Sequence, residues 1–266
     1  MSRLRLFARS LFLASTLLIA HSCFCWGVTG HRIVAEIAQQ HLSKKAKKEI
    51  KKLFGREALA WWANWGDFIK SDSNWNQANV WHYVHVEGKL AKGAYGAALK
   101  ALPGKNLYSQ TVAMMADLRN ESLSVEQRQI ALKFLIHFIG DLHQPLHVGG
   151  RPDDQGGNKI PVSWFDKPTN LHSLWDSGLI DFQQYSFSEY ARLLDIASDD
   201  EVKAIQSGSL EDWFYESNQL AEDIYNASPA DSKLSYRYNF KFQKMLDNQL
   251  LKGGLRLAKL LNETFD

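Results

Sequence analysis

The residues best suited to chemistry in this sequence are two pairs of histidine and aspartate with a spacing of four, His137 with Asp141 and His172 with Asp176. On a helix, residues four apart share a face, and their Cβ atoms lie about 5–6 Å apart. Each pair would therefore direct one nitrogen and one oxygen at the same point. Zn²⁺ binds such ligands at about 2.0–2.2 Å. Because His147 stands between the two pairs, the stretch from residue 137 to residue 176 predicts a zinc site.

The surroundings of the first pair favour a metal over an ordinary contact. A single His-x-x-x-Asp pair is often only a structural contact within a helix. Residues 125–142, however, are apolar almost all round, which predicts a helix in the centre of a bundle. Burying an imidazole and a carboxylate there costs free energy unless something compensates, and a divalent metal does so. Zinc suits these ligands, although manganese and iron are chemically compatible with them.

The first 25 residues predict a secretory signal peptide. Arg3, Arg5 and Arg9 form a positive segment and residues 11–20 an apolar one, the pattern typical of such signals. Cleavage after Cys25 would leave residues 26–266 as the mature zinc-dependent domain. An uncleaved anchor is disfavoured because a membrane span needs about 20 apolar residues. A lipoprotein cut before Cys23 is disfavoured because His21 fits that cleavage motif poorly.

Cleavage would also remove the only two cysteines, so the mature protein would be exported and yet hold no disulfide. This combination favours a bacterial protein, periplasmic or secreted, over a eukaryotic one. The formal net charge of +2 becomes −1 without the three arginines of the signal. Such a balance excludes a global basic field for nucleic acid. We expect no membrane association after cleavage, and the sequence implies no stable protein partner.

Helices must position these side chains, because apolar residues recur at intervals of three and four along most of the chain. The expected helical segments are residues 31–53, 57–70, 108–120, 125–142, 171–182, 187–197, 210–226 and about 231–262. Alternation predicts an extended segment over residues 80–86, and residues 89–105 are expected to be looped in part. The Gly-rich residues 149–170 predict an irregular loop with at most a short hairpin. Without repeats or linkers, we expect one mainly α domain over residues 26–266.

Six short motifs carry a resemblance to a known family. They are Trp26-Gly-x-x-Gly-His31, Trp65-Gly-Asp67-Phe-Ile-Lys70, Trp81-His82-Tyr-Val, His137-x-x-Gly-Asp141-x-His143-Gln-Pro-Leu-His147, Gly156-Gly-Asn158 and Asn170-Leu-His172-x-x-Trp-Asp176. In these motifs and in their order, the chain resembles the secreted single-strand-specific zinc nucleases and 3′-nucleotidases. Their superfamily also contains zinc-dependent phospholipase C. The match extends over nearly all of the expected mature chain.

The resemblance implies a mainly α, single-domain multi-helix bundle with at most short β-hairpins, which holds three zinc ions in a cleft. The first zinc would be bound by Asp67, His82, His137 and Asp141. The second would be bound by His147, His172 and Asp176. The third would be bound by His31, the shared Asp141, and the free amine and carbonyl of Trp26. Only cleavage after Cys25 would create that amine.

The resemblance also implies the reaction, which is hydrolysis of single-stranded DNA and RNA to 5′-phosphorylated nucleotides. Single 3′-nucleotides would be further substrates. Zinc ions that share Asp141 would activate the attacking water and stabilise the leaving 3′-oxygen. Asp67 would help to orient that water. Lys70, one helical turn from Asp67, would lie near the phosphate.

Four residues match the positions that bind the nucleobase in the family, namely Tyr83, His85, Gly157 and Asn158. Stacking on the ring of Tyr83 would favour unpaired bases of any sequence. His85 departs from the carboxylate that is usual in the family, and a neutral imidazole accepts hydrogen bonds with only one nitrogen. The base preference and the choice between DNA and RNA therefore stay open.

Two other functions are compatible with a zinc cluster. A phospholipase C would use the same scaffold, but Asp176 in place of a glutamate and the loop that ends at Asn158 argue against it. A non-catalytic zinc protein would not need clustered metals, since a structural site closes its coordination. For His143 we expect a hydrogen bond to a metal ligand rather than a bond to a metal.

Overall fold

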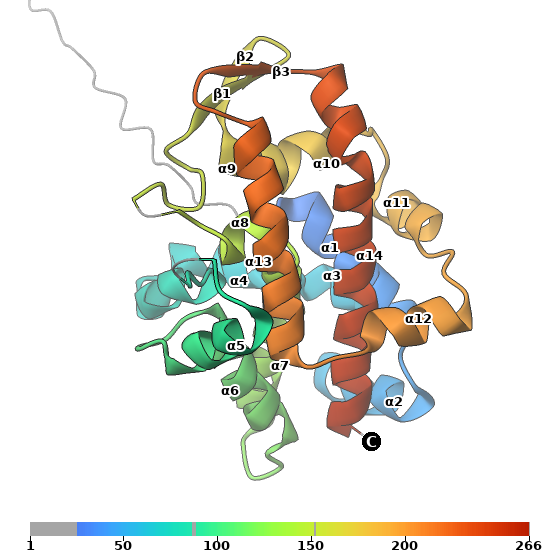
Figure 1. The fold of residues 1–266 in the computed structure, drawn as a ribbon. Helices are drawn as coiled ribbons and strands as arrows, with labels where there is room; N and C mark the ends of the chain where they lie inside the picture. Colours follow the sequence, from blue (N-terminus) through green and yellow to red (C-terminus); the bar gives the residue numbers. More distant parts are fainter. Residues whose placement is uncertain (1–25, 87–88, 152, 266) are drawn as a thin grey trace, which may run out of the picture.

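The computed structural model describes residues 26–86, 89–151 and 153–265. The predicted signal peptide, residues 1–25, lies outside the described residues. Within these ranges helices predominate, and the strands form one small sheet (Figure 1). The expected mainly α, single-domain fold is therefore confirmed. None of the described helices is both long and apolar enough to cross a bilayer.

Three helices form the centre of the bundle, α1 (Val28–Gln40), α7 (Val125–Leu142) and α14 (Tyr236–Phe265). Nearly every residue of the second half of α7 is buried, as its apolar character predicts. Both α1 and α7 pack against α14. The approach of α1 is close, because a Cβ at Gly254 of α14 would lie 2.5 Å from the Cβ of Ile37. The helix that carries His137 and Asp141 thus lies in the interior.

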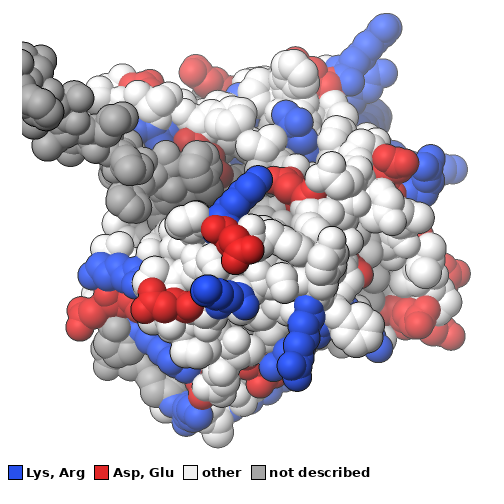
Figure 2. Space-filling model, turned by 90° about the horizontal axis from the view of Figure 1, so that it is seen from above, with Lys and Arg blue, Asp and Glu red and all other residues white. Residues whose placement is uncertain are grey.

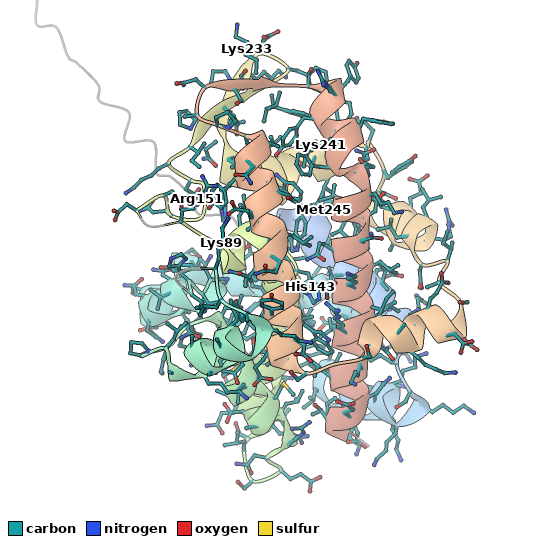
Figure 3. The ribbon with its side chains drawn as sticks, viewed as in Figure 1. Lys89, His143, Arg151, Lys233, Lys241 and Met245 are labelled. Atoms are coloured by element: carbon teal, nitrogen blue, oxygen red, sulfur yellow. The ribbon has the colours of Figure 1, made fainter. Side chains whose placement is uncertain are left out.

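A buried polar network joins the end of α7 to two long helices. α13 (Leu210–Ala227) runs beside α14, and its Glu216 forms ion pairs with Lys252 and Arg256 of α14. Arg256 also donates from Nη1 to Nε2 of His143 at 3.1 Å. Figure 3 shows His143 between the two helices. A buried guanidinium is tolerated when it is paired and hydrogen-bonded. Because Arg256 bonds to His143, the residue after α7, this network anchors the end of that helix.

The two helices expected in the N-terminal quarter of the chain are interrupted. Residues 31–53 form α1 and α2 (Lys44–Phe54), because the hydroxyl of Ser43 accepts from the N–H of Ala46 at 3.0 Å and starts a new helix. Residues 57–70 form α3 (Leu59–Trp62), α4 (Trp65–Phe68) and most of the 3₁₀ helix η1 (Ile69–Ser71). The apolar periodicity continues across these breaks, so it does not reveal them.

The extended segment expected over residues 80–86 is only partly correct. The 3₁₀ helix η2 (Ser73–His82) includes its first three residues, and the carboxylate of Asp72 caps that helix by accepting from Asn74 N–H. After η2 the chain is extended, and His85 forms an isolated antiparallel bridge with Gly149. This bridge places residues 83–86 beside the segment that follows His147.

The remaining helices surround this centre. They are α5 (Lys92–Ala101), α6 (Leu107–Arg119), α8 (Pro145–Val148), α9 (Leu171–Ser173), the π-helix η3 (Leu174–Gly178), α10 (Leu179–Phe182), α11 (Phe187–Leu194) and α12 (Asp199–Gln206). α5 occupies much of the region expected to be looped in part, and α12 was not expected. Ser198 and Glu201 form a capping box at the start of α12, which is a signal that a sequence can show.

The small sheet closes one end of the bundle, at the top of Figure 1. Its strands are β1 (Pro161–Trp164), β2 (Lys167–Asn170) and β3 (Ser232–Leu234), in the order β2-β1-β3. β1 pairs with β2 as the expected antiparallel hairpin and with β3 in parallel. The two turn residues, Phe165 and Asp166, have φ angles of 48° and 61°, which suits a two-residue hairpin turn. β2 leads directly into α9 and η3, which carry His172 and Asp176.

Charge is dispersed over the face of the molecule that carries the small sheet. Figure 2, a view onto the end with the sheet, shows lysine, arginine, aspartate and glutamate interspersed among uncharged residues. The near-zero net charge of the chain is therefore not the sum of two large patches on this face. On this face, attraction of an anion would depend on individual cations.

Candidate metal centre

The structure brings all eight predicted ligand side chains into three groups. Within each group the candidate ligand atoms lie within 4.8 Å of one another. The groups are His31 with Asp67 and His137, His82 with His137 and Asp141, and His147 with His172 and Asp176. The third group is the predicted second zinc site. The other two share His137 and together contain the side chains predicted for the first and third sites.

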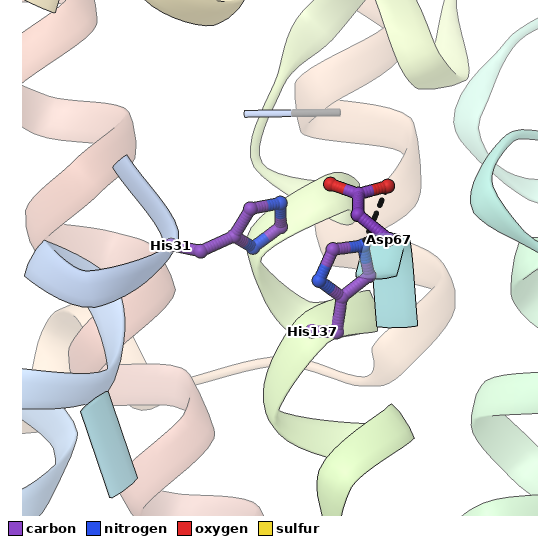
Figure 4. Close-up of side chains that lie close together, drawn as sticks. All are labelled: His31, Asp67 and His137. Atoms are coloured by element: carbon purple, nitrogen blue, oxygen red, sulfur yellow. Dashed lines mark ion pairs between the residues drawn. The ribbon is translucent and has the colours of Figure 1, made fainter. Parts of the chain in front are cut away.

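The first group joins three elements that lie far apart in the sequence. Figure 4 shows His31 of α1, Asp67 of α4 and His137 of α7 converging. The imidazole rings of His31 and His137 stack with centroids 3.9 Å apart. Oδ1 of Asp67 lies 3.7 Å from Nε2 of His137. Such a convergence of a carboxylate and two imidazoles is the donor set that zinc prefers.

Two glycines that stand in the motifs, but to which the sequence analysis gave no role, make this convergence sterically feasible. A Cβ at Gly140 would lie 2.5 Å from Nδ1 of His31, and a Cβ at Gly66 would lie 2.7 Å from Cδ2 of His137. Either methyl group would push an imidazole out of place. In the sequence, each glycine directly precedes a candidate ligand, Asp67 or Asp141, and that adjacency is the signal that could have identified them.

Asp141 occupies the middle of the centre. Its Oδ2 lies 3.1 Å from Nδ1 of His82 and 3.4 Å from Nε2 of His137. Its Oδ1 lies 3.4 Å from Nε2 of His31 and 3.8 Å from Nδ1 of His147. Burial opposes ionisation, but the histidines outweigh it and hold the pKa of Asp141 well below its usual range. An ionised carboxylate between two groups can serve a metal in each.

The third group is held by short helices around the turn of η3. Nε2 of His172 lies 3.1 Å from Oδ2 of Asp176, and Nε2 of His147 lies 3.6 Å from Oδ1 of the same carboxylate. η3 contains a single π turn, closed by the N–H of Leu179 and the carbonyl of Leu174. Such turns are frequent at functional sites. Here the turn begins directly after α9 and carries Asp176 back towards His172.

Gln144 is a further residue that supports the metal centre and to which the sequence analysis gave no role. Its Nε2 donates to Oδ1 of Asp176 at 2.5 Å, and its Oε1 accepts from the N–H of Leu146 at 2.7 Å. Both ends of the amide are therefore engaged, and the amide is fully buried. This arrangement fixes which oxygen of Asp176 faces the centre. Partners of this kind are often as important to a metal site as the ligands are.

Main-chain carbonyls determine how three of the histidines are oriented. Nδ1 of His137 donates to the carbonyl of Ala63. Nδ1 of His147 and Nδ1 of His172 donate in the same way to the carbonyls of His82 and Gly156, and all three distances are 2.7–2.8 Å. A carbonyl only accepts, so each Nδ1 carries a proton, and Nε2 is the nitrogen left to bind a metal. All three Nε2 atoms face the carboxylates of the centre. This is the usual way in which proteins prepare histidine for a metal.

The donor atoms fit a divalent cation. Several are buried and, among the described residues, have no hydrogen-bond partner; they are both ring nitrogens of His31, Oδ1 of Asp141, Nε2 of His147 and of His172, and Oδ2 of Asp176. Buried polar atoms without partners are costly. Nε2 of His172 and Oδ2 of Asp176 lie 3.1 Å apart, but with the imidazole proton on Nδ1 both atoms offer only lone pairs, so no hydrogen bond joins them. Atoms arranged in this way are satisfied together by a shared metal.

The ionisation of the histidines agrees with this fit in part. Burial lowers the pKa values of His82 and His137 to about 4, so both are neutral at neutral pH and able to bind a metal. In His147, burial is outweighed by Asp176 and Asp141, which raise the pKa to about 9. A metal at the third group would therefore have to displace a proton from His147.

A cavity of about 1120 Å³ opens on the centre. Its walls include three histidines of the groups, His82, His147 and His172, together with Lys70. The ammonium group of Lys70 donates to Oδ1 of Asp67 at 2.7 Å. The predicted phosphate-binding lysine and the metal groups thus share one space.

Three of the four predicted nucleobase residues also line this cavity, namely Tyr83, His85 and Asn158. The side chain of Tyr83 is 46% exposed, so its ring can receive a base. Gly157 is different. It is buried at a φ of 85°, where a Cβ would lie 3.4 Å from Leu171, and it is absent from the described cavity wall, to which its neighbour Gly156 contributes instead.

His143 does not have the role that we expected. Its Nδ1 donates to the carbonyl of Ile139 at 2.7 Å, and its Nε2 accepts from Arg256. Burial and the guanidinium of Arg256 lower the pKa of His143 to about 3. Because both ring nitrogens are engaged with groups outside the metal centre, the expected hydrogen bond to a metal ligand is wrong. His143 belongs to the network that anchors the end of α7.

Trp26 is placed beside the third group. Its side chain is fully buried, and the next residue, Gly27, donates from its N–H to the carbonyl of Asp176 at 2.6 Å. The main chain at residues 26 and 27 therefore lies against a candidate ligand. The predicted amine of Trp26 depends on the bond to Cys25, which lies outside the described residues, so this ligand stays a prediction.

A helical bundle with clustered histidines and aspartates under one cavity defines a candidate metal-binding enzyme. Residues 26–266 match the model of the S1/P1 nuclease family, and the chain belongs to that family. It is therefore an endonuclease, a hydrolase of the phosphodiester bonds of nucleic acid. The resemblance inferred from the six motifs is confirmed.

Individual relatives agree over nearly the full length. The chain is 30% identical to Endonuclease 4 of Arabidopsis thaliana, over 97% of this chain and 94% of that protein. It is 33% identical to Nuclease P1 of Penicillium citrinum, over 90% of this chain and 97% of that protein. It is 24% identical to Nuclease S1 of Aspergillus oryzae, over 94% and 95%. These matches favour a nuclease over both alternatives considered from the sequence.

Proposed function

We propose that this endonuclease uses three zinc ions to hydrolyse single-stranded DNA and RNA, releases 5′-phosphorylated nucleotides, and also removes the phosphate of 3′-nucleotides. The observation that carries the proposal is the opening of one cavity onto the metal groups. Lys70 and Tyr83 line that same cavity. A metal cluster, a cation for the phosphate and a ring for the base are the three parts that such a reaction needs.

The proposed zinc ligands are the residues of the three groups together with Trp26, assigned to the ions as the family resemblance implies. His147, His172 and Asp176 would hold one ion. Asp67, His82, His137 and Asp141 would hold a second, and His31, Asp141 and the main chain of Trp26 would hold a third. The position of Asp141 between His31 and His137 supports its sharing by two ions. Bound zinc would supply Lewis acidity, an activated water and charge stabilisation in the transition state.

Asp67 and Lys70 are the proposed catalytic side chains. Burial opposes the charge on Asp67, but His137 and Lys70 keep its pKa below the usual range. The carboxylate is thus ionised at neutral pH and can accept a hydrogen bond from the attacking water. Lys70 neutralises charge that develops on the phosphate. The 2.7 Å bond between the two side chains sets the direction of both.

Unpaired bases are selected by the proposed nucleobase site. The half-exposed ring of Tyr83 offers a stacking surface, and each stacked base contributes about 1–3 kcal/mol. His85 lines the cavity with both ring nitrogens buried and without a partner in the described structure. A base edge would satisfy one or both of them. A paired base would have to leave its duplex first, which explains why single strands are preferred.

Export is part of the same proposal. Residues 1–25 are proposed to direct the chain out of the cytoplasm of a bacterium and to be removed after Cys25. The burial of Trp26 and the bond from Gly27 to Asp176 support a functional place for the processed end. A protein that begins with an additional Met before Trp26 should bind less zinc and lose most of its activity. Equal zinc content and equal rates in the two forms would contradict this part.

The test of the proposal is product analysis with the protein that begins at Trp26. Circular single-stranded DNA, RNA, the matched duplex, a 3′-nucleotide and phosphatidylcholine vesicles are the substrates. We expect linearised circles, 5′-phosphate ends and little action on duplex or lipid. Chelation should abolish activity, and zinc should restore it better than manganese. Cleavage of lipid alone, or nuclease activity that survives chelation, would refute the proposal.

A further inference from the structure

Arg151 is a cation in the cavity wall that neither the motifs nor the metal groups include. It follows Gly149 and Gly150 on the loop after α8, and it lines the cavity together with His85 and His172. Figure 3 shows Arg151 on the same side of the molecule as Lys89, next to α13. Its side chain is exposed. A guanidinium in this position is available to a strand that enters the cavity.

The backbone before Arg151 is fixed closely. Gly149 pairs with His85 in a β-bridge, and it lies so close to α13 that a Cβ would collide with Ala221. A Cβ at Gly150 would lie 3.5 Å from Nδ1 of His85 and 3.5 Å from the backbone of Gly156. Gly156 in turn accepts the hydrogen bond of His172. Arg151 therefore follows directly on a contact between the proposed base site and the metal centre.

The guanidinium itself is held in place by α13. Its central carbon lies 4.3 Å from the ring centroid of Tyr225, and Nη2 donates to Oδ1 of Asn226 at 3.4 Å. A stacked guanidinium keeps its charge and most of its donors, and it loses less rotational freedom when it binds an anion. This is the state in which arginine recognises a phosphate with two parallel hydrogen bonds.

The guanidinium of Arg151 forms no direct ion pair among the described residues. The main-chain N–H of Arg151 donates to Oδ1 of Asp154 at 3.2 Å, but in the described ranges no carboxylate forms an ion pair with its guanidinium, whereas Lys70 pairs with Asp67 and Lys89 with Glu222. The negative charge of Asp153 in the cavity wall is accompanied by the positive charge of Lys159 in the same wall. Among the cations of this wall, Arg151 is the one that is both stacked and without an ion pair in the part of the chain that the structure describes.

We propose that Arg151 binds a second phosphate of the substrate strand, next to the phosphate that is hydrolysed. The inference rests on the proposed hydrolysis of single strands. It adds that the enzyme recognises a second phosphate of the strand. The ligand is a phosphodiester of an oligonucleotide. A trinucleotide, which has two internal phosphates, is therefore a better substrate than a dinucleoside monophosphate, which has one. Arg151 binds the second phosphate and thereby selects longer substrates, and it makes no contact with the reacting atoms.

Steady-state kinetics of Arg151→Ala with these two substrates tests the proposal. We expect kcat/KM for the trinucleotide to fall about 10-fold, as for the loss of a charge-assisted hydrogen bond, mostly through KM. The value for the dinucleoside monophosphate should change by less than about 2-fold. Arg151→Lys should recover only part of the loss because it lacks the planar fork. Arg192→Ala is the matched control, because the side chain of Arg192 on α11 is exposed and lies outside the cavity wall. Its kcat/KM for both substrates should equal that of wild type.

A second measurement is the salt dependence of KM. The logarithm of KM for a longer single strand should vary with the logarithm of salt concentration, and Arg151→Ala should reduce that slope by about 0.7, the contribution of one phosphate contact. An equal loss on both short substrates, with a lower melting temperature, would mean that Arg151 only supports α13, and would overturn the proposal. If wild type cleaves neither substrate, the proposed function fails instead.

Discussion

The floor and the wall of the cavity are built in different ways. The floor consists of the three metal groups, whose side chains are buried, apart from the partly buried Asp67, and are held by helices and by main-chain carbonyls. The wall consists of residues 83–85 and the loop after α8, whose key side chains, Tyr83 and Arg151, are exposed. On the floor, each position is determined by several neighbours. On the wall, side chains are placed mainly by short backbone contacts, so chemistry and substrate choice should respond separately to mutation.

The strongest test of this difference is Asp141→Ala on the floor. Asp141 faces His31, His82 and His137 at 3.1–3.4 Å, and its removal should affect two ions. We expect activity to fall by more than about 1000-fold. The zinc content, measured by atomic absorption, should fall further than for any other single ligand variant. Zinc content equal to wild type would refute the bridging role.

Gly140→Ala tests whether the floor tolerates one additional carbon. The new Cβ would lie 2.5 Å from Nδ1 of His31, and overpacking of this kind costs about 1–3 kcal/mol. We expect lower zinc content and about 100-fold lower activity. Gly93→Ala is the control, because its Cβ meets nothing within 4 Å, and it should keep full activity. Wild-type zinc binding by Gly140→Ala would show that the stacked histidines can move.

Gln144→Met removes a hydrogen bond while the ligand stays in place. Asp176 would lose its partner at 2.5 Å, and loss of such a partner typically lowers metal affinity about 10–100-fold. Competition with a zinc-binding dye measures this change. Gln183→Met, which affects an amide bonded to Asn239 and Gln243, should leave the affinity unchanged. If both variants bind zinc equally well, Gln144 does not position Asp176.

Tyr83→Ala is the matching change on the wall and should have the smallest effect. Loss of one stacked base costs about 1–3 kcal/mol, so KM for a single strand should rise about 10-fold. Zinc content and melting temperature should stay as in wild type, because the ring is 46% exposed. A loss of zinc in this variant would mean that the wall and the floor are coupled.

The sequence predicts the floor better than the wall, for a physical reason. His137 and Asp141, or His172 and Asp176, are brought together by local helical geometry, which spacing reveals. The apolar residues of α7 likewise show where that helix is buried. The wall depends on the bridge between His85 and Gly149 and on the stacking of Arg151 on Tyr225. These contacts join distant segments, and no local pattern encodes them.

Some features of the floor were also hidden from the sequence. The need for Gly66 and Gly140 follows from the distance between helices, which spacing along one helix does not give. The engagement of His143 by Arg256 depends on α14, more than 100 residues further along the chain. The break at Ser43 and the short helix α12 are different cases. Both depend on side-chain caps, and their serines are visible in the sequence.

One metal group joins His31 of α1 to Asp67 of α4 and His137 of α7, which are far apart in the sequence. A cation shared by such distant segments acts as a cross-link, and closing long loops is costly in the unfolded chain. The centre can therefore form only late in folding, after α1, α4 and α7 have docked. Until then the histidines and aspartates are a scattered set of weak ligands. The hydrolytic machinery is thus assembled only when folding is nearly complete, so a partly folded chain would have no means of cutting nucleic acid.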